Sequence, residues 1–295
     1  MKFLMFTKYL QDLNVEAMAS TVADLGFDGV DLTTRPGGSV QPERVETDLP
    51  EFVRILRGHG LEVGMLTTSI TAADTPHAED IFRTASELGV SYLKLGYYHY
   101  GEFGTLAGQI KEIRKRLHGL AALARRYKVT ACVHTHSGHS VPPSVELLYL
   151  LLQGFDPVEI AAYPDPAHNF VEGGLSGWKM GLDLLSGRIA VVGIKDYGWY
   201  HQDDHPDHPY FTQDLGKQGW IPLLVPLTEG VVKWPEVFAC LRRSGFDGYL
   251  SFHAEYEAVT SGGRLVFKKL SAREVLGQTR LDLAYLKRVI AASTM

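Results

Sequence analysis

Cysteine is scarce in this chain: Cys132 and Cys240 are the two among 295 residues. One lies in a predicted strand and the other in a predicted helix, so no disulfide framework is expected, and a reducing cytoplasm fits best. Long apolar runs are also missing, since none approaches the roughly 20 residues of a transmembrane helix. The first ten residues are too short and too interrupted for a signal peptide. These absences predict a cytoplasmic protein that does not engage a membrane.

Positive charge is in deficit, with 29 Lys and Arg against 34 Asp and Glu, for a formal net charge of −5. A chain with this balance offers no broad basic surface to neutralise a phosphate backbone, so we expect no nucleic-acid partner. A Gly-rich dinucleotide fingerprint is also absent after the first predicted strand, which counts against a Rossmann fold and a nucleotide cofactor.

What the sequence does contain is a regular alternation of short apolar runs and longer amphipathic runs. It predicts eight strands, at about 3–6, 29–33, 61–67, 91–95, 129–136, 158–163, 189–194 and 249–252. It predicts helices at about 15–25, 50–59, 76–88, 105–127, 142–152, 175–185, 234–243 and 272–290. Strict alternation, with crossovers long enough to join parallel strands, predicts a single-domain α/β fold of the (β/α)₈ TIM-barrel type over residues 1–295. A long loop is expected at about 197–232.

The fifth predicted strand carries two histidines, His134 and His136, to its carboxyl end. Because side chains alternate along a strand, both rings share a face. Taken alone, each could be an ordinary packed or loop histidine. In a barrel, however, polar residues at the strand ends emerge at one mouth, where barrel enzymes place their chemistry. The residues expected there are Arg35, Thr67, Thr68, His99, His134, His136, Asp165, His168, Lys195, Asp196, His253 and Glu255.

Imidazole and carboxylate groups that converge in this way are typical ligands of a divalent metal. Nitrogen donors favour Mn²⁺, Co²⁺ or Zn²⁺ over Mg²⁺. The sequence therefore predicts a metal site at the barrel mouth, with the identity of the metal left open.

Three segments resemble the sugar phosphate isomerase/epimerase family, which has xylose isomerase-like barrels and includes endonuclease IV and ketose 3-epimerases. They are Asp165-x-x-His168, the run 194–196 (Ile-Lys-Asp) and the run 245–251 (Gly-Phe-Asp-Gly-Tyr-Leu-Ser). The resemblance spans nearly the whole chain as a fold pattern.

Typical members of that family bind one divalent metal through Glu, Asp, His and Glu at the ends of strands five to eight. By position these ligands fall on His134, Asp165, Gly193 and His253, and only Asp165 matches in type. Two interpretations follow. Either the metal site is rebuilt from His134, Asp165 and His253, with Glu255 or His136 as further candidates, or the metal is lost and Lys195 supplies part of its charge.

The resemblance implies proton abstraction next to a sugar carbonyl to give an enediolate. Reprotonation would give an epimer, whereas loss of a β-substituent would make the protein a keto-glycoside lyase or a dehydratase. The expected roles are Glu255 or His136 as the base, His168 as a hydrogen-bond donor to substrate, and Lys195 as the electrophile. Arg35 is expected to clamp a carboxylate or phosphate, and Trp199 with Tyr200 to cover a sugar at the mouth.

Two other functions are alternatives to the isomerase. A phosphodiesterase resembling endonuclease IV would need a multi-zinc cluster and a basic track, and the acidic chain with Gly193 lacks both signs. A non-catalytic sugar-binding barrel is harder to dismiss, because a changed ligand set is what a retired enzyme would show. For the isomerase or lyase and for the sugar-binding barrel alike, the expected partner is a small sugar or sugar derivative. Because barrels of this family often pair, a homo-oligomer is one expected assembly.

Overall fold

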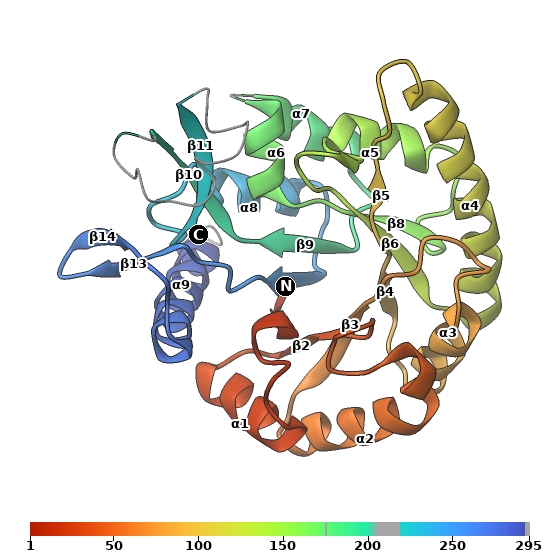
Figure 1. The fold of residues 1–295 in the computed structure, drawn as a ribbon, viewed down its shortest axis with the longest axis horizontal. Helices are drawn as coiled ribbons and strands as arrows, with labels where there is room; N and C mark the ends of the chain where they lie inside the picture. The colour runs from red at the N-terminus through yellow and green to blue at the C-terminus, as the bar shows by residue number, and fades with distance from the viewer. Residues whose placement is uncertain (175, 202, 204–218, 293–295) are drawn as a thin grey trace. The chain divides into compact units, whose positions relative to one another are not determined.

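The structure is a computed structural model, and it describes residues 1–174, 176–201, 203 and 219–292. Eight parallel strands form one sheet in the order β8-β6-β4-β3-β2-β1-β12-β9 (Figure 1). Their bounds are β1 (Lys2–Phe6), β2 (Gly29–Thr33), β3 (Glu62–Thr67), β4 (Tyr92–Lys94), β6 (Thr130–His134), β8 (Ile160–Tyr163), β9 (Val191–Ile194) and β12 (Tyr249–Phe252).

The two ends of this sheet meet and close it into a barrel. Ala162 of β8 bridges to Ile189, just before β9. Its amide donates to the Arg188 carbonyl at 2.8 Å, and its carbonyl accepts from the Ala190 amide at 3.0 Å. All eight strands belong to one compact unit, residues 1–194 and 239–253. The predicted (β/α)₈ barrel is therefore confirmed.

Helices follow the barrel strands in the chain, and local signals fix several of their ends. They are α1 (Val15–Leu25), α2 (Val45–Gly58), α3 (Ala78–Glu87), α4 (Leu106–Tyr127), α5 (Val145–Leu152), α6 (Pro166–Gly173), α7 (Gly177–Leu184), α8 (Trp234–Arg243) and α9 (Ala272–Ala292). The bounds of α1 match the prediction because Asn14 caps its start, accepting from the Ala17 amide at 2.9 Å, and Gly26 ends it at a φ of 88°.

Two helix predictions need correction. Helix α2 begins at Val45, so Pro50 lies inside it rather than at its start. A proline there removes one intrahelical hydrogen bond, and burial of Val45 and Leu49 keeps the earlier turn helical. Helix α6 was not predicted at all, although Asp165 followed by Pro166 is a strong start signal.

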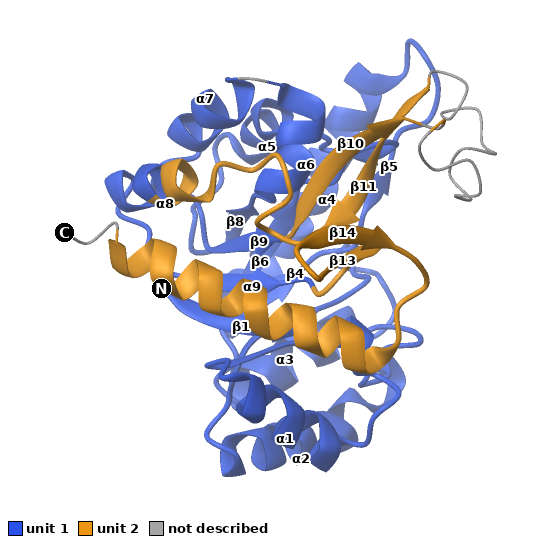
Figure 2. Cartoon of the chain, turned by 90° about the vertical axis from the view of Figure 1, so that its left-hand side faces the viewer, with its two compact units in different colours: residues 1–194, 239–253 blue, residues 195–238, 254–295 orange. Residues whose placement is uncertain are grey.

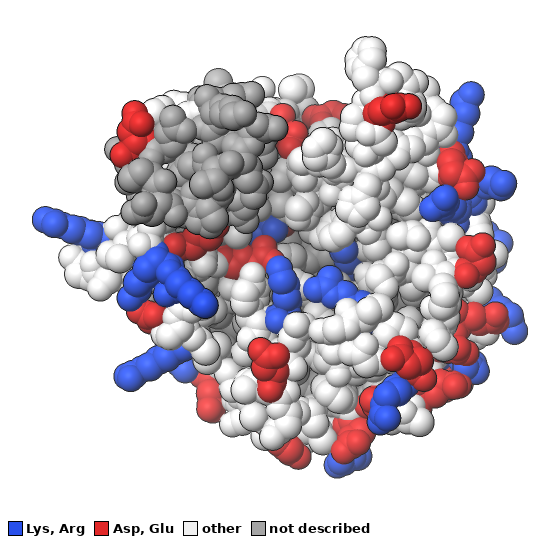
Figure 3. Space-filling view, in the orientation of Figure 1, with Lys and Arg blue, Asp and Glu red and all other residues white. Residues whose placement is uncertain are grey.

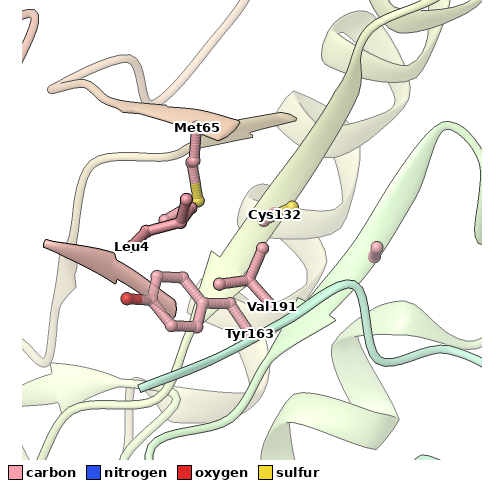
Figure 4. Close-up of a cluster of buried hydrophobic side chains, with 6 residues drawn as sticks. Leu4, Met65, Cys132, Tyr163 and Val191 are labelled. Atoms are coloured by element: carbon pink, nitrogen blue, oxygen red, sulfur yellow. The ribbon is translucent and has the colours of Figure 1, made fainter. Parts of the chain in front are cut away.

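The inner part of the barrel contains an apolar cluster of Leu4, Met65, Cys132, Ala161, Tyr163 and Val191 (Figure 4). Gly64 lets this cluster pack closely, because a Cβ at that position would lie 2.6 Å from Leu4 Cδ1. Cys132 is buried and packs within this cluster. This cluster is an apolar layer of the barrel, and its Tyr163 contacts His134 and His253 at the carboxyl ends of the strands.

The remaining described residues form a second compact unit, residues 195–238 and 254–295, coloured separately in Figure 2. It contains two antiparallel hairpins, β10 (Asp196–His201) with β11 (Trp220–Val225) and β13 (Ala258–Ser261) with β14 (Arg264–Phe267). The passage 197–232, predicted as a loop, thus contains two paired strands; residues 202 and 204–218 lie outside the described residues. The single domain over 1–295 stays a prediction.

Asp196 explains why the first hairpin forms there. Its Oδ1 accepts from the amides of Tyr197, Val231 and Val232 at 2.8 to 3.1 Å, and its Oδ2 accepts from Trp234 Nε1 at 2.9 Å. This carboxyl group ties both ends of the passage together, so Asp196, which was expected among the polar residues at the barrel mouth, has a structural role.

Two features of the surface and the helices bear on possible partners. On the face shown in Figure 3, Lys and Arg are interspersed with Asp and Glu and form no single basic area. No helix among residues 1–174, 176–201 and 219–292 combines the length and the apolar composition that crossing a membrane requires.

Candidate active site

Buried polar side chains gather at the carboxyl ends of β6, β8 and β12, all within the barrel unit. His134 is the last residue of β6, Asp165 and His168 follow β8, and His253 follows β12. Each is at most 7% exposed. The ring centroids of His134 lie 6.0 Å from His253 and 6.1 Å from His168. The structure thus brings together residues that are up to 119 positions apart in the chain, as the barrel prediction required.

Asp165 lies at the centre of this group and is held by the start of α6. Its Oδ1 accepts from the amides of Ala167 at 2.9 Å and His168 at 3.3 Å, while its own amide donates to Thr135 Oγ1 at 2.9 Å. The other carboxylate oxygen, Oδ2, lies 3.6 Å from His134 Nε2 and 3.8 Å from His168 Nε2. One oxygen therefore caps a helix while the other faces two imidazoles.

Hydroxyl groups hold the far side of both imidazoles. Tyr97 Oη lies 3.1 Å from His134 Nδ1, and Ser137 Oγ lies 2.8 Å from His168 Nδ1. A hydroxyl that accepts from Nδ1 leaves the lone pair on Nε2, the arrangement that orients a histidine toward a ligand or a proton. His136 packs beside His168, with the two ring centroids 4.0 Å apart. Its Nδ1 lies 3.0 Å from the Ser137 carbonyl oxygen.

The residues at the mouth do not form a complete metal site. Within the described residues, no group of three or more His, Cys, Asp or Glu side chains is arranged to hold a metal ion. His253 directs Nε2 to Tyr163 Oη at 2.9 Å. At Gly193, a Cβ would lie 2.9 Å from Asp165 Oδ2, so the Asp165 carboxylate takes the space that a ligand at that position would need. That His134, Asp165 and His253 bind a metal stays a prediction.

Two charged residues of the barrel unit were missed by sequence analysis. Asp31 of β2 is fully buried and accepts from Thr67 Oγ1 and Ser251 Oγ, each at 2.7 Å. Burial raises the pKa of Asp31 from 3.8 to about 6, although these hydrogen bonds and the charges of Lys94 and Arg35 oppose the rise. The available signal was a single charge within an apolar strand run, Gly-Val-Asp-Leu-Thr.

Lys94, the last residue of β4, is the second missed charge. It is 3% exposed, and its Nζ lies 3.4 Å from the ring centroid of Tyr97. A cation over an aromatic face at this distance is a favourable contact, especially when it is desolvated. Tyr97 in turn contacts His134, so the buried cation is linked to the mouth through one ring.

Other predicted residues of the barrel unit lie at the edge of this group or outside it. Arg35 is half-buried, with its guanidinium carbon 5.9 Å from the ring of Phe6, and that ring packs 4.6 Å from His253. Thr68 Oγ1 donates to the Lys94 carbonyl at 2.8 Å and so has a structural role. His99 is exposed in the short strand β5 (Tyr98–His99).

The predicted base and electrophile pair with each other in the second unit. Lys195 Nζ donates to Glu255 Oε2 at 3.0 Å, and the two side chains are 3% and 12% exposed. Trp199 of β10 is 44% exposed, while the ring of Tyr200 packs 4.7 Å from that of Phe267. Removing one partner of a buried ion pair of this kind is strongly destabilising, because the other charge is left buried and uncompensated.

The fold is a closed parallel barrel with buried imidazoles and a carboxylate at its carboxyl-terminal mouth, the end at which TIM-barrel enzymes place their active sites. The family model described as xylose isomerase-like TIM barrel matches residues 19–283, and the chain belongs to that family. The predicted family is thereby confirmed. A comparison with curated protein sequences finds no match.

Solved structures show the same fold at low sequence identity. A 3-keto-D-glucoside 4-epimerase from E. coli is 14% identical, with 98% of this chain and 99% of that chain covered and a TM-score of 0.69. A probable 3-DHS dehydratase from Bacillus anthracis is 15% identical, with 95% and 98% covered and a TM-score of 0.64. A xylose isomerase-like TIM-barrel protein from Mycobacterium smegmatis in complex with magnesium is 13% identical, with 100% and 98% covered and a TM-score of 0.66.

Proposed function

We propose that this protein is a sugar isomerase or epimerase that removes a proton from the carbon next to a sugar carbonyl. The observation that carries the proposal is the convergence of His134, Asp165, His168 and His253, all buried, at the mouth of a xylose isomerase-like barrel. Burying several ionisable groups together is costly for a fold and is typical of a catalytic site. The similarity to a 3-keto-D-glucoside 4-epimerase supports a carbohydrate substrate.

The chemistry needs a base, a group that stabilises the oxyanion, and exclusion of water. The base takes the carbon-bound proton, the bonding electrons form the double bond of an enediolate, and the carbonyl oxygen gains the negative charge. Reprotonation of the same carbon from the other face gives an epimer, and reprotonation of the neighbouring carbon gives an isomer. A low-polarity barrel strengthens the electrostatic interactions that stabilise this anion.

The chain offers residues for each role. We propose Glu255 or His136 as the base and Lys195 as the cation that stabilises the oxyanion. His168, oriented by Ser137 and Asp165, would donate to a substrate oxygen. The remaining proposed substrate contacts are Arg35, as a clamp for a carboxylate or phosphate, and Trp199, as an aromatic platform.

Solvent exchange tests the reaction without knowledge of the product. The protein is incubated in deuterated buffer with a panel of ketoses and 3-keto-glycosides, and deuterium at the carbon next to the carbonyl is followed by mass spectrometry and NMR. We expect exchange with wild-type protein and its loss in Asp165→Asn, purified in parallel as the control. Absence of exchange across the panel would favour a non-catalytic sugar-binding barrel.

A lyase or dehydratase is the second candidate, and the similarity to a probable 3-DHS dehydratase favours keeping it. In that reaction the same enediolate expels a β-substituent: the bond between the β-carbon and its oxygen breaks, and the bonding electrons leave with that oxygen. The proton taken up by the base is returned to the oxygen, so the leaving group departs as an alcohol or water. Release of the leaving group alongside deuterium incorporation would identify this outcome in the same assay.

Metal assistance is a separate proposal with its own measurement. Purified protein is analysed for Mn, Co and Zn, together with His134→Ala and Asp165→Ala. If His134, Asp165 and His253 bind a metal, both variants lose most of it. Unchanged metal content in both variants would end this proposal while leaving the proton-abstraction proposal to the exchange assay.

A further inference from the structure

A cavity of about 260 Å³ lies beside the candidate active site, within the barrel unit. It is lined by Thr71 in the loop after β3, by the run 97–99 after β4, and by residues in the first half of α4, among them Ile113. Tyr97 also belongs to the candidate active site, since its Oη lies 3.1 Å from His134 Nδ1 and its ring lies 5.0 Å from that of His136. The cavity and the candidate active site therefore share Tyr97 as a wall.

Hydrogen bonds between neighbouring segments hold the walls of this cavity in place. Tyr98 Oη donates to the Thr71 carbonyl at 2.9 Å, and Gln109 Nε2 of α4 donates to the His99 carbonyl. Strand β5 is also paired with β7 (Ser140–Val141). A pocket that is formed before the ligand arrives loses little conformational entropy on binding.

The side chains that line the cavity suit a neutral ligand with several hydroxyl groups. Glu112 and Arg116 of α4 form an ion pair, with 3.2 Å between Arg116 Nε and Glu112 Oε1, and their side chains are 52% and 43% exposed. Their opposite charges balance, so this wall favours neither an anion nor a cation, while the carboxylate can accept from hydroxyl groups and the guanidinium can donate to them. Tyr97 and Tyr98 add aromatic surface, against which the C–H face of a sugar can pack.

The size of the cavity limits what it can hold. Pockets for drug-sized ligands measure roughly 300 to 1,000 Å³, so about 260 Å³ corresponds to one small ring. We propose that this cavity is a subsite for the second sugar ring of a glycoside, and that the substrate is a keto-disaccharide whose reacting ring lies at the barrel mouth. The substrate assignment rests on the proposed function. Contacts with a ring that does not react help to orient the ring that does.

Substrate selectivity tests the subsite in the deuterium-exchange assay. Exchange is measured with 3-keto-maltose, 3-keto-cellobiose and, as the single-ring counterpart, methyl 3-keto-glucoside. We expect wild-type protein to prefer a disaccharide. In Glu112→Gln and Arg116→Gln, the ratio of kcat/KM for that disaccharide to kcat/KM for methyl 3-keto-glucoside should fall about tenfold, the size of a lost hydrogen bond to a charged group.

The control variant breaks a similar ion pair at another place in the barrel unit. Arg44→Gln removes the exposed pair of Arg44 with Asp48, which also has the i,i+4 spacing. Exposed pairs contribute little to stability, so all three variants should fold, and Arg44→Gln should keep the wild-type ratio. An unchanged ratio in both Glu112→Gln and Arg116→Gln overturns the subsite.

Methyl NMR tests the subsite without any reaction. Ile113 is 3% exposed and lines the cavity, so its ¹³C-labelled δ1 methyl signal, assigned from its loss in Ile113→Val, reports on the space beside it. Titration with maltose or cellobiose should shift this signal to saturation, with weaker affinity in Arg116→Gln, and methyl glucoside should shift it less. No saturable shift with either disaccharide, or an equal shift with methyl glucoside, overturns the subsite. Absence of exchange with every compound would instead overturn the proposed function, and a saturable shift would still identify the cavity as a sugar site.

Discussion

Replacing Asp165 separates two contributions that one side chain makes to this protein. Its Oδ1 caps α6 by accepting from two amides, whereas its Oδ2 faces the imidazoles of His134 and His168. Asp165→Ala removes both contributions. Asp165→Asn keeps an oxygen that can cap the helix, because Asn is as good an N-cap as Asp, but it removes the negative charge.

The expected loss of stability in Asp165→Ala follows from the loss of the helix cap. Loss of an N-cap costs about 0.5 to 2 kcal/mol, and Asp165 satisfies two buried amides, so we expect Asp165→Ala to lower the free energy of unfolding by about 2 kcal/mol. Asp165→Asn should retain most of that stability. Both variants should lose deuterium exchange, since the charge beside the imidazoles is gone in each.

Urea unfolding followed by circular dichroism, together with the exchange assay, measures both effects. Asn14→Ala is the matched control, because it removes the α1 cap, where Asn14 accepts from the Ala17 amide, at a position outside the candidate active site. It should lose stability and keep exchange. Equal destabilisation by Asp165→Ala and Asp165→Asn would refute the capping argument, and full exchange in Asp165→Asn would refute the role of the carboxylate.

Three further predictions concern buried polar groups. Because burial raises the pKa of Asp31 from 3.8 to about 6, the native state holds this proton more tightly than the unfolded chain. The free energy of unfolding should therefore fall by about 3 kcal/mol as pH rises from about 4 to about 6, at about 1.4 kcal/mol per pH unit. Urea unfolding of wild type and Asp31→Asn at both pH values checks this. A difference in stability between the two proteins that does not change with pH would contradict it. Among the described residues, neither polar atom of the buried Asn169 amide has a hydrogen-bond partner. Asn169→Leu removes a desolvation penalty of about 1 to 3 kcal/mol, so it should unfold at an equal or higher urea concentration than wild type. A clear loss of stability would count against this. Lys195→Met removes the ion-pair partner of buried Glu255 and should lower the free energy of unfolding by about 3 kcal/mol. Lys195→Met combined with Glu255→Leu should lower it by less than the single change. If urea unfolding shows that the losses of the two single variants simply add in the double variant, the pair is not coupled.

The barrel could be predicted from local sequence patterns because each of its strands is marked by an apolar or alternating run. Period-two and apolar runs gave the eight strands, and capping residues such as Asn14 and Gly26 gave the ends of α1. The β10–β11 hairpin was missed because its connection spans about twenty residues, so no short turn motif marks the pairing. The β13–β14 hairpin was missed although Gly262-Gly263, which joins its strands, is a short turn signal. Asp31 was missed because its donors, Thr67 and Ser251, are far from it in the chain, and only the tertiary structure brings them to its carboxylate.

The sequence alone determined which residues end which strands, since alternation of strand and helix fixes the direction of every barrel strand. It thereby placed His134, Asp165, His168 and His253 at one mouth. Only the tertiary structure decided which atoms meet: Asp165 Oδ2 faces His134 and His168, while His253 turns to Tyr163. The physical reason is that closure of the barrel sets distances of a few ångströms between side chains far apart in the chain, and no local pattern encodes such distances.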